Sequence, residues 1–313
     1  MTTLAKMQPA GSAIHRRHSR LSTTSSLPEY EVGDYVQLQA LSATASQSES
    51  SSLPDYDALS TSPSTSSAAA AASAVTAFRH TTAFQIETAG HPLFHLPLPP
   101  RPVPIPVLRV SADGALGDLA YESLRARRGS GSCTLVRGGD GAEAPVCSTS
   151  YRFGPGKNPQ LRLHGRLADP AEVYEVQGKG IATRAQAVRT HLGTFEWRYA
   201  GRADRRALGA SSLLLLERVT VVALAGGKKK EERRVVVGMF VRSAELRTQG
   251  TSGCTAGNGG RLLLNLAEWA DEKLAHEQME ILAIASCIVM LKKEIDRRRV
   301  QQCMMMSGGG GGP

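Results

Sequence analysis

Two short motifs near the start of the chain have the residue types that WW domains bind. They are Leu27-Pro28-Glu29-Tyr30 and Leu53-Pro54-Asp55-Tyr56, and each follows two serines. In a Leu-Pro-x-Tyr ligand the extended proline enters an aromatic groove and the tyrosine fills a second pocket. Two copies predict bivalent binding to a tandem-WW protein, for example a HECT-type ubiquitin ligase. The alternative is coincidence, because four-residue patterns arise easily in a low-complexity segment.

A cluster of basic residues lies close to the other end of the sequence. Such a cluster predicts contact with anionic lipid headgroups. The alternative is that these cations complement the dipole at a helix C-terminus and keep the chain soluble. The cluster consists of Lys292, Lys293, Arg297, Arg298 and Arg299.

Other candidate sites are weaker. Arg16-Arg17-His18-Ser19 fits a basophilic kinase site, which makes Ser19 a candidate phosphosite, although such tripeptides are frequent in Ser-rich segments. The stretch 250–260 is rich in Gly but lacks the Gly-Lys-Ser/Thr ending of a phosphate-binding loop, so a hairpin loop is predicted. No catalytic triad, carboxylate pair or metal-ligand spacing is recognisable. The sequence therefore predicts a non-enzymatic protein without cofactor or metal.

Charge is distributed unevenly along the 313 residues, which carry a net charge of +9. Residues 1–75 hold four basic and six acidic side chains, so the excess of positive charge lies in the remainder. A basic globular part suits an anionic partner, and a membrane surface is predicted in preference to nucleic acid. An ordinary solvated surface with excess Lys and Arg is the alternative.

Cysteine usage and the N-terminal sequence bear on location. The five cysteines are scattered and form no Cys-x-x-Cys pair, which favours a reducing compartment such as the cytoplasm. The protein could there be attached peripherally to a membrane. Residues 1–28 lack acidic side chains, as mitochondrial presequences do. Pro9 and Gly11 would interrupt the amphipathic helix of such a signal, so mitochondrial import is the minority alternative.

Composition divides the chain into three parts. Residues 1–76 are dominated by Ser, Thr and Ala without apolar periodicity, and are predicted to be a disordered tail. Residues 77–302 are predicted to form one domain, with its core from about residue 106. Residues 303–313 are predicted to be a second disordered tail.

Short strand-like segments punctuated by Gly and Asn fill most of this domain. In 194–199, Phe195, Trp197 and Tyr199 alternate with Glu196 and Arg198, as in a strand with one buried face. Leu213–Leu216 and Val235–Val237 are continuous apolar runs, typical of strands buried on both faces or lining a filled barrel. The Lys- and Arg-rich stretch 226–234 between them is predicted to be an exposed hairpin loop.

The final element is predicted to be a helix over 272–302 with Asp271 as N-cap. Its segment 279–291 is apolar on nearly every side, so protein or lipid must enclose it. That segment is shorter than the ~20 residues of a membrane span. The sequence therefore predicts a mainly β fold, a closed antiparallel barrel of about 10–12 strands around one central hydrophobic C-terminal helix.

This pattern resembles the tubby C-terminal-like superfamily, which includes tubby domains, phospholipid scramblases and LURP-one-related proteins, and in particular a branch of fungal proteins. The resemblance covers about 106–302 and is carried by 193–199, 213–218, 255–261 and 285–299. It implies a barrel threaded by the terminal helix, and a membrane-associated role. The tubby phosphoinositide motif and the scramblase calcium-binding loop are not recognisable. The resulting hypothesis is an adaptor whose tail recruits a WW protein and whose barrel binds a membrane or protein surface; a phosphoinositide- or anionic-lipid-binding module is the alternative, with a scramblase-like role behind it.

Overall fold

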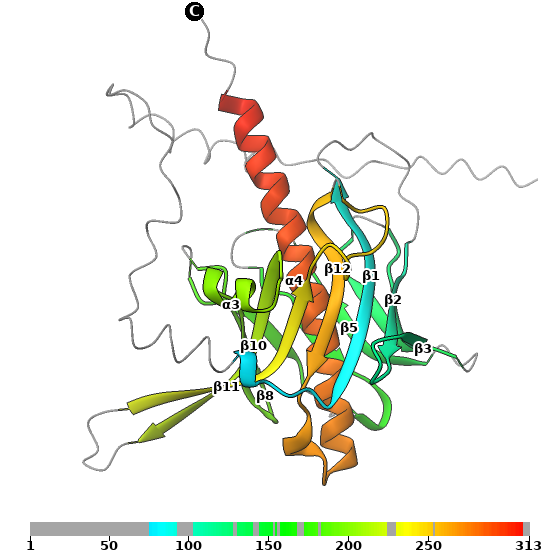
Figure 1. The fold of residues 1–313 in the computed structure, drawn as a ribbon, viewed down its shortest axis with the longest axis vertical. Helices are drawn as coiled ribbons and strands as arrows, with labels where there is room; N and C mark the ends of the chain where they lie inside the picture. Colours follow the sequence, from blue (N-terminus) through cyan, green and yellow to red (C-terminus); the bar gives the residue numbers. More distant parts are fainter. Residues whose placement is uncertain are drawn as a thin grey trace, which may run out of the picture. The chain divides into compact units, whose positions relative to one another are not determined.

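A computed structural model describes residues 75–92, 103–127, 130–139, 144–152, 154, 157–167, 172–180, 183–223, 230–252 and 254–308. Within these residues, twelve antiparallel strands close into a barrel around one long helix, α4 (Lys273–Gly308) (Figure 1). The predicted fold class is therefore confirmed. The strands are β1 (Thr82–Pro92), β2 (Ile105–Val110), β3 (Leu116–Leu124), β4 (Cys133–Arg137), β5 (Pro145–Ser150), β6 (Gln160–Leu163), β7 (Tyr174–Gly178), β8 (Gln186–Thr190), β9 (Gly193–Tyr199), β10 (Ser212–Ala223), β11 (Lys230–Arg242) and β12 (Cys254–Leu264).

The strands follow one another around the barrel in chain order. Each pairs with its neighbours in sequence, and β1 closes the sheet by pairing with both β2 and β12. Short helical elements connect β6 to β7 and β9 to β10, namely η2 (Gly165–Leu167) and α3 (Arg202–Ala207), and η3 (Ala267–Trp269) lies between β12 and α4. A closed sheet leaves no long edge unpaired, and its interior must be filled.

The alternation predicted for β9 is confirmed. Phe195 and Trp197 belong to the interior core, and Trp197 is fully buried. Glu196 and Arg198 point to the outer face, where Glu196 pairs with Lys179 at 2.8 Å. One strand thus supplies core contacts on one side and an ion-pair network on the other, as its period of two requires.

The apolar run Leu213–Leu216 is buried on both faces of β10. Leu214 and Leu216 join the core inside the barrel, whereas Leu213 and Leu215 join a second cluster with Val75 and Met239. The outer cluster is covered in part by the segment that precedes β1. Continuous apolar sequence is needed here because neither face of the strand meets solvent.

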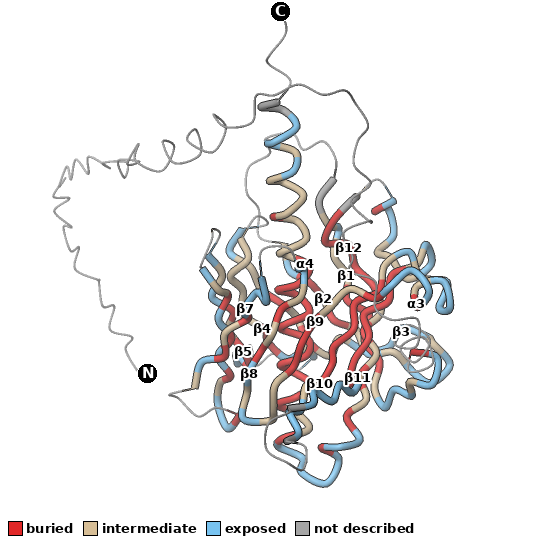
Figure 2. Tube along the Cα trace, turned by 90° about the vertical axis from the view of Figure 1, so that its left-hand side faces the viewer, coloured by how far each residue is buried: buried red, intermediate tan, exposed pale blue. Residues whose placement is uncertain are grey.

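The helix α4 fills the barrel. All residues from 278 to 291 are buried, so the segment that is apolar on nearly every side is enclosed by the sheet (Figure 2). By length and composition α4 could also cross a membrane, and 83% of its most apolar window is buried inside the protein. The apolar segment of α4 is therefore enclosed by the strands of the barrel, as one of the two possibilities drawn from the sequence requires.

The prediction of a loop over 250–260 is wrong from Cys254 onward, because β12 begins there and runs through Gly257, Gly259 and Gly260. A Cβ at Gly257 would lie 2.5 Å from Ile295 of α4, and the backbone there has φ +68°. Glycine is therefore required at position 257 so that strand and helix can approach closely. In the sequence alone, the same glycines indicate a turn.

Two boundaries and one strand also differ from expectation. Residues 230–234, predicted as part of a loop, continue β11 in an arm paired with the end of β10. The strand β8 was not predicted, because it contains few strong strand formers. The helix begins at Lys273, and the His276 amide donates to the Glu272 carbonyl, so Glu272 rather than Asp271 occupies the N-cap position. The helix continues to Gly308.

Candidate functional site

Polar side chains of α4 meet specific partners on the barrel wall. Inside the barrel, the Trp197 indole donates to Ser286 Oγ at 2.9 Å, and the Tyr121 hydroxyl donates to Glu280 at 2.7 Å. Buried polar groups are costly unless hydrogen-bonded, so only one rotation and depth of the helix satisfies both pairs. These contacts fix which residues of α4 reach the end of the barrel.

Glu294 connects α4 to the wall where the helix leaves the barrel, an end that we call the barrel mouth. Its carboxylate accepts two hydrogen bonds from Arg242, at 2.7 and 2.5 Å. It also accepts one from the Tyr199 hydroxyl at 2.7 Å and one from the Gly257 amide at 3.2 Å. Burial by itself would raise the pKa of Glu294, but the hydrogen bonds and charge of Arg242 outweigh it and lower the pKa.

Asp296 makes a second connection on the other side of α4. It accepts hydrogen bonds from the Tyr151 hydroxyl at 2.6 Å and from Lys292 at 2.5 Å. Lys292 also lies over the Tyr151 ring, and its side chain is only 11% exposed. Lys292 and Arg242 are thus committed to internal ion pairs.

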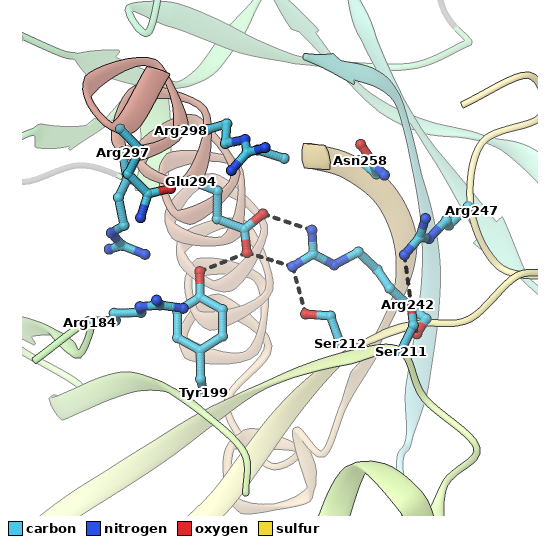
Figure 3. Close-up of a pocket in the computed structure, with 12 residues that line it drawn as sticks. Arg184, Tyr199, Ser211, Ser212, Arg242, Arg247, Asn258, Glu294, Arg297 and Arg298 are labelled. Carbon is cyan, nitrogen blue, oxygen red and sulfur yellow. Dashed lines mark hydrogen bonds and ion pairs between the residues drawn. The ribbon is translucent and has the colours of Figure 1, made fainter. Parts of the chain in front are cut away.

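Two pockets lie at the barrel mouth, one beside each of these carboxylates. The Glu294 pocket has a volume of about 470 Å³ (Figure 3). Its lining includes the α4 residues Glu294, Arg297, Arg298 and Gln301, together with Arg184, Tyr199, Ser211, Ser212, Arg242, Arg247, Ala256 and Asn258 from the wall. Five arginines therefore surround a single carboxylate that is already saturated by Arg242, Tyr199 and Gly257.

The Asp296 pocket has a volume of about 360 Å³. Arg297 lines both pockets and so lies between them. The remaining lining is Tyr151, Arg152, Gly154, Lys157, Gln186, Lys293, Asp296 and Val300. Burial, and next the charge of Arg297, lower the pKa of Lys293, as expected for a partly buried cation beside another positive charge.

Most cations in these pockets have no acidic partner among the residues that the structure describes. Among the described residues, no carboxylate lies within ion-pair distance of the group that we call the mouth cations. They are Arg152, Lys157, Arg184, Lys293, Arg247, Arg297 and Arg298. Concave sites lined by unpaired guanidinium groups favour phosphate or carboxylate ligands, because the planar fork binds two oxygens at once.

The five residues of the basic cluster predicted from the sequence have different surroundings in the structure. Lys293, Arg297 and Arg298 line the pockets, Lys292 is committed to Asp296, and Arg299 lies 3.8 Å from Asp296. Sequence reasoning missed the wall residues. Arg184, Arg247 and Arg152 are each isolated in sequence, so no local signal could have linked them to α4.

Several sequence-based candidates lie outside the described residues. They include Ser19 and both Leu-Pro-acid-Tyr motifs, which remain predictions. Within the part of the chain that the structure describes, no three His, Cys, Asp or Glu side chains gather as a metal site would need.

Comparison with known proteins adds no match. No family model, no curated protein and no solved structure is similar to this chain at a significant level. The twelve-strand barrel packed around a long buried C-terminal helix is consistent with a tubby-like fold.

Proposed function

We propose that this chain is a non-catalytic binding module whose barrel mouth holds the phosphate groups of anionic lipids at a membrane surface. The observation that carries the proposal is the set of mouth cations, which line two adjoining pockets and have no acidic partner in the part of the chain that the structure describes. Pockets of a few hundred Å³ are of a size that suits a small ligand or headgroup.

Electrostatics supports a membrane over a freely diffusing acidic protein as the anionic partner. Each Lys or Arg near an anionic leaflet contributes about 1 kcal/mol of attraction, so several cations at one end of the barrel would give stable peripheral binding. The resemblance to the tubby-like superfamily, whose members act at membranes, agrees with this proposal. The cytoplasmic location proposed from the sequence would give access to the anionic leaflet.

The experiment is flotation of the full chain with vesicles of phosphatidylcholine, with and without phosphatidylserine. The Arg297→Glu/Arg298→Glu variant should lose most binding to the anionic vesicles. Arg162→Glu/Arg189→Glu is the matched control, because it makes the same change in net charge at exposed positions outside both pockets. Equal loss in both variants, or no binding by the natural chain, would contradict a site at the mouth.

A second proposed function, recruitment of a WW protein by the tail, follows from the paired motifs at Leu27–Tyr30 and Leu53–Tyr56. Together the two activities would make the chain an adaptor that brings a WW-containing partner, such as a HECT-type ubiquitin ligase, to a membrane. The two are independent, since each has its own residues.

A further inference from the structure

The helix α4 does not stop at the pockets. It continues past Arg298 to Gly308 and projects from the barrel mouth (Figure 2). Met304 and Met305 lie on this projecting part, with exposed fractions of 64% and 62%. They are the most exposed large hydrophobic side chains among the described residues.

The register of the helix relates these methionines to the arginines of the pockets. Met304 follows Arg297 by seven residues, and Met305 follows Arg298 by seven. Seven residues make close to two turns, so each methionine lies on the same face as its arginine, about 10 Å further along the axis. Cations therefore come first and apolar side chains second along the direction in which α4 leaves the protein.

This order matches the layers of an anionic leaflet. Amphipathic elements bound to a membrane place cations at headgroup level and bury apolar side chains about 5–10 Å deeper. Methionine is flexible and polarizable, and so adapts to an irregular apolar environment. A protein partner would have to combine an apolar socket with an acidic rim at the same spacing, whereas an anionic bilayer has both layers.

We infer that the Cys303–Met305 end of α4 inserts into the interfacial layer of an anionic bilayer while the mouth cations bind its headgroups. This inference rests on the proposed membrane binding, and deepens it by assigning a depth and an orientation. The barrel would stand on the leaflet with α4 directed into it.

The test uses the full chain and vesicles of about four parts phosphatidylcholine to one part phosphatidylserine. Met304→Gln/Met305→Gln removes the apolar contact without changing charge, and Gln is tolerated in helices. This variant should bind about tenfold more weakly, from the apolar area it no longer buries. The matched control is Val221→Gln/Val222→Gln on the β10 arm, where the side chains are 57% and 44% exposed, and it should bind like the natural chain.

Insertion depth supplies a second readout. A fluorophore attached to Cys303, which is the one exposed cysteine among the described residues, should be quenched by bromine on the lipid acyl chains. Cys303→Ser controls for labelling elsewhere.

Each outcome decides a specific claim. Normal binding by the methionine variant with loss in Arg297→Glu/Arg298→Glu would overturn insertion and leave headgroup binding intact. Quenching of the Cys303 fluorophore by probes on the headgroups, but not by bromine on the acyl chains, would also overturn insertion and leave headgroup binding intact. If the natural chain binds vesicles neither with nor without phosphatidylserine, the proposed function and this inference are both wrong. If α4 contacts a protein instead, the methionine variant would lose that partner and keep its affinity for vesicles.

Discussion

Arg242 on β11 and Glu294 on α4 form a two-point ion pair at the barrel mouth, with their side chains only 6% and 10% exposed. The pair joins the wall to the helix and satisfies both charges internally. It thereby distinguishes a cation that is neutralised inside the protein from cations without such a partner, a difference that the sequence does not reveal. Arg242 is structural, whereas Arg297 and Arg298, one turn further along α4, line the pocket and form no ion pair with any described carboxylate.

Removing the Glu294 carboxylate should destabilise the protein strongly. In Glu294→Ala the Arg242 guanidinium would stay buried without its partner, a situation that typically costs about 3–5 kcal/mol. The free energy of unfolding can be measured in urea. Glu245→Ala, which removes an exposed acid with no ion pair among the described residues, should change it by less than about 0.5 kcal/mol. Similar values for the two variants would show that the Arg242–Glu294 pair contributes nothing to stability.

Acid should weaken the same connection. Because the pKa of Glu294 in the folded protein lies below its ordinary value of 4.5, its stabilising contribution is complete above that pH and is lost as pH falls through the folded pKa. Glu196, whose pKa is also lowered despite burial because Lys179 and Arg234 bind it, acts in the same direction. The free energy of unfolding should therefore be steady from about pH 7 to pH 5 and decrease below. Glu294→Ala should show a smaller decrease, and an unchanged profile would contradict this assignment.

Gly257→Ala should loosen the packing of β12 against α4. The added methyl group would lie 2.5 Å from Ile295 and 3.1 Å from the Leu291 carbonyl, at a backbone φ of +68°. Gly250→Ala is a close control, because φ there is +73° and nothing lies within 4 Å. The control should cost about 1 kcal/mol for the backbone conformation, and Gly257→Ala at least about 2 kcal/mol more from the overlap. Thermal unfolding of the two variants measures the difference, and equal melting temperatures would show that β12 and α4 adjust freely.

Binding to anionic vesicles should fall as salt rises. Headgroup attraction is screened over about 8 Å at physiological ionic strength, whereas apolar insertion is not. The slope of log affinity against log salt should therefore be smaller for Arg297→Glu/Arg298→Glu than for the natural chain, and unchanged for Met304→Gln/Met305→Gln. Identical slopes in all three proteins would mean that the mouth cations do not contact the headgroups.

The two tail motifs should act together. Tyr30→Ala/Tyr56→Ala should abolish capture by a tandem WW protein, because each tyrosine fills one recognition pocket. Each single variant should retain weaker binding, since linkage raises the apparent affinity of a bivalent ligand. Titration against an immobilised tandem WW protein compares the variants, with Tyr35→Ala as the control in the same segment. Unchanged binding by the double variant would eliminate these motifs as ligands.

The sequence alone determined the enclosed helix and, through it, the architecture. Residues 279–291 are apolar on nearly every side of a helix, and the sequence before them consists largely of strand-like segments that could enclose them. Alternation in 194–199 likewise identified which side of a strand faces the core. These are local patterns, in which the physical requirement and the residues that reveal it lie within a few positions of one another.

Only the tertiary structure decided the site. Arg184 on the segment before β8, Arg247 after β11 and Arg297 on α4 are far apart in sequence, and closure of the barrel places them around one pocket (Figure 3). The same closure separates Lys292 and Arg242, whose charges are neutralised by buried carboxylates, from cations with no acidic neighbour among the described residues. Composition counts all of these charges equally. Which of them are available depends on long-range packing, because a carboxylate neutralises only the cation that the fold brings within hydrogen-bonding distance.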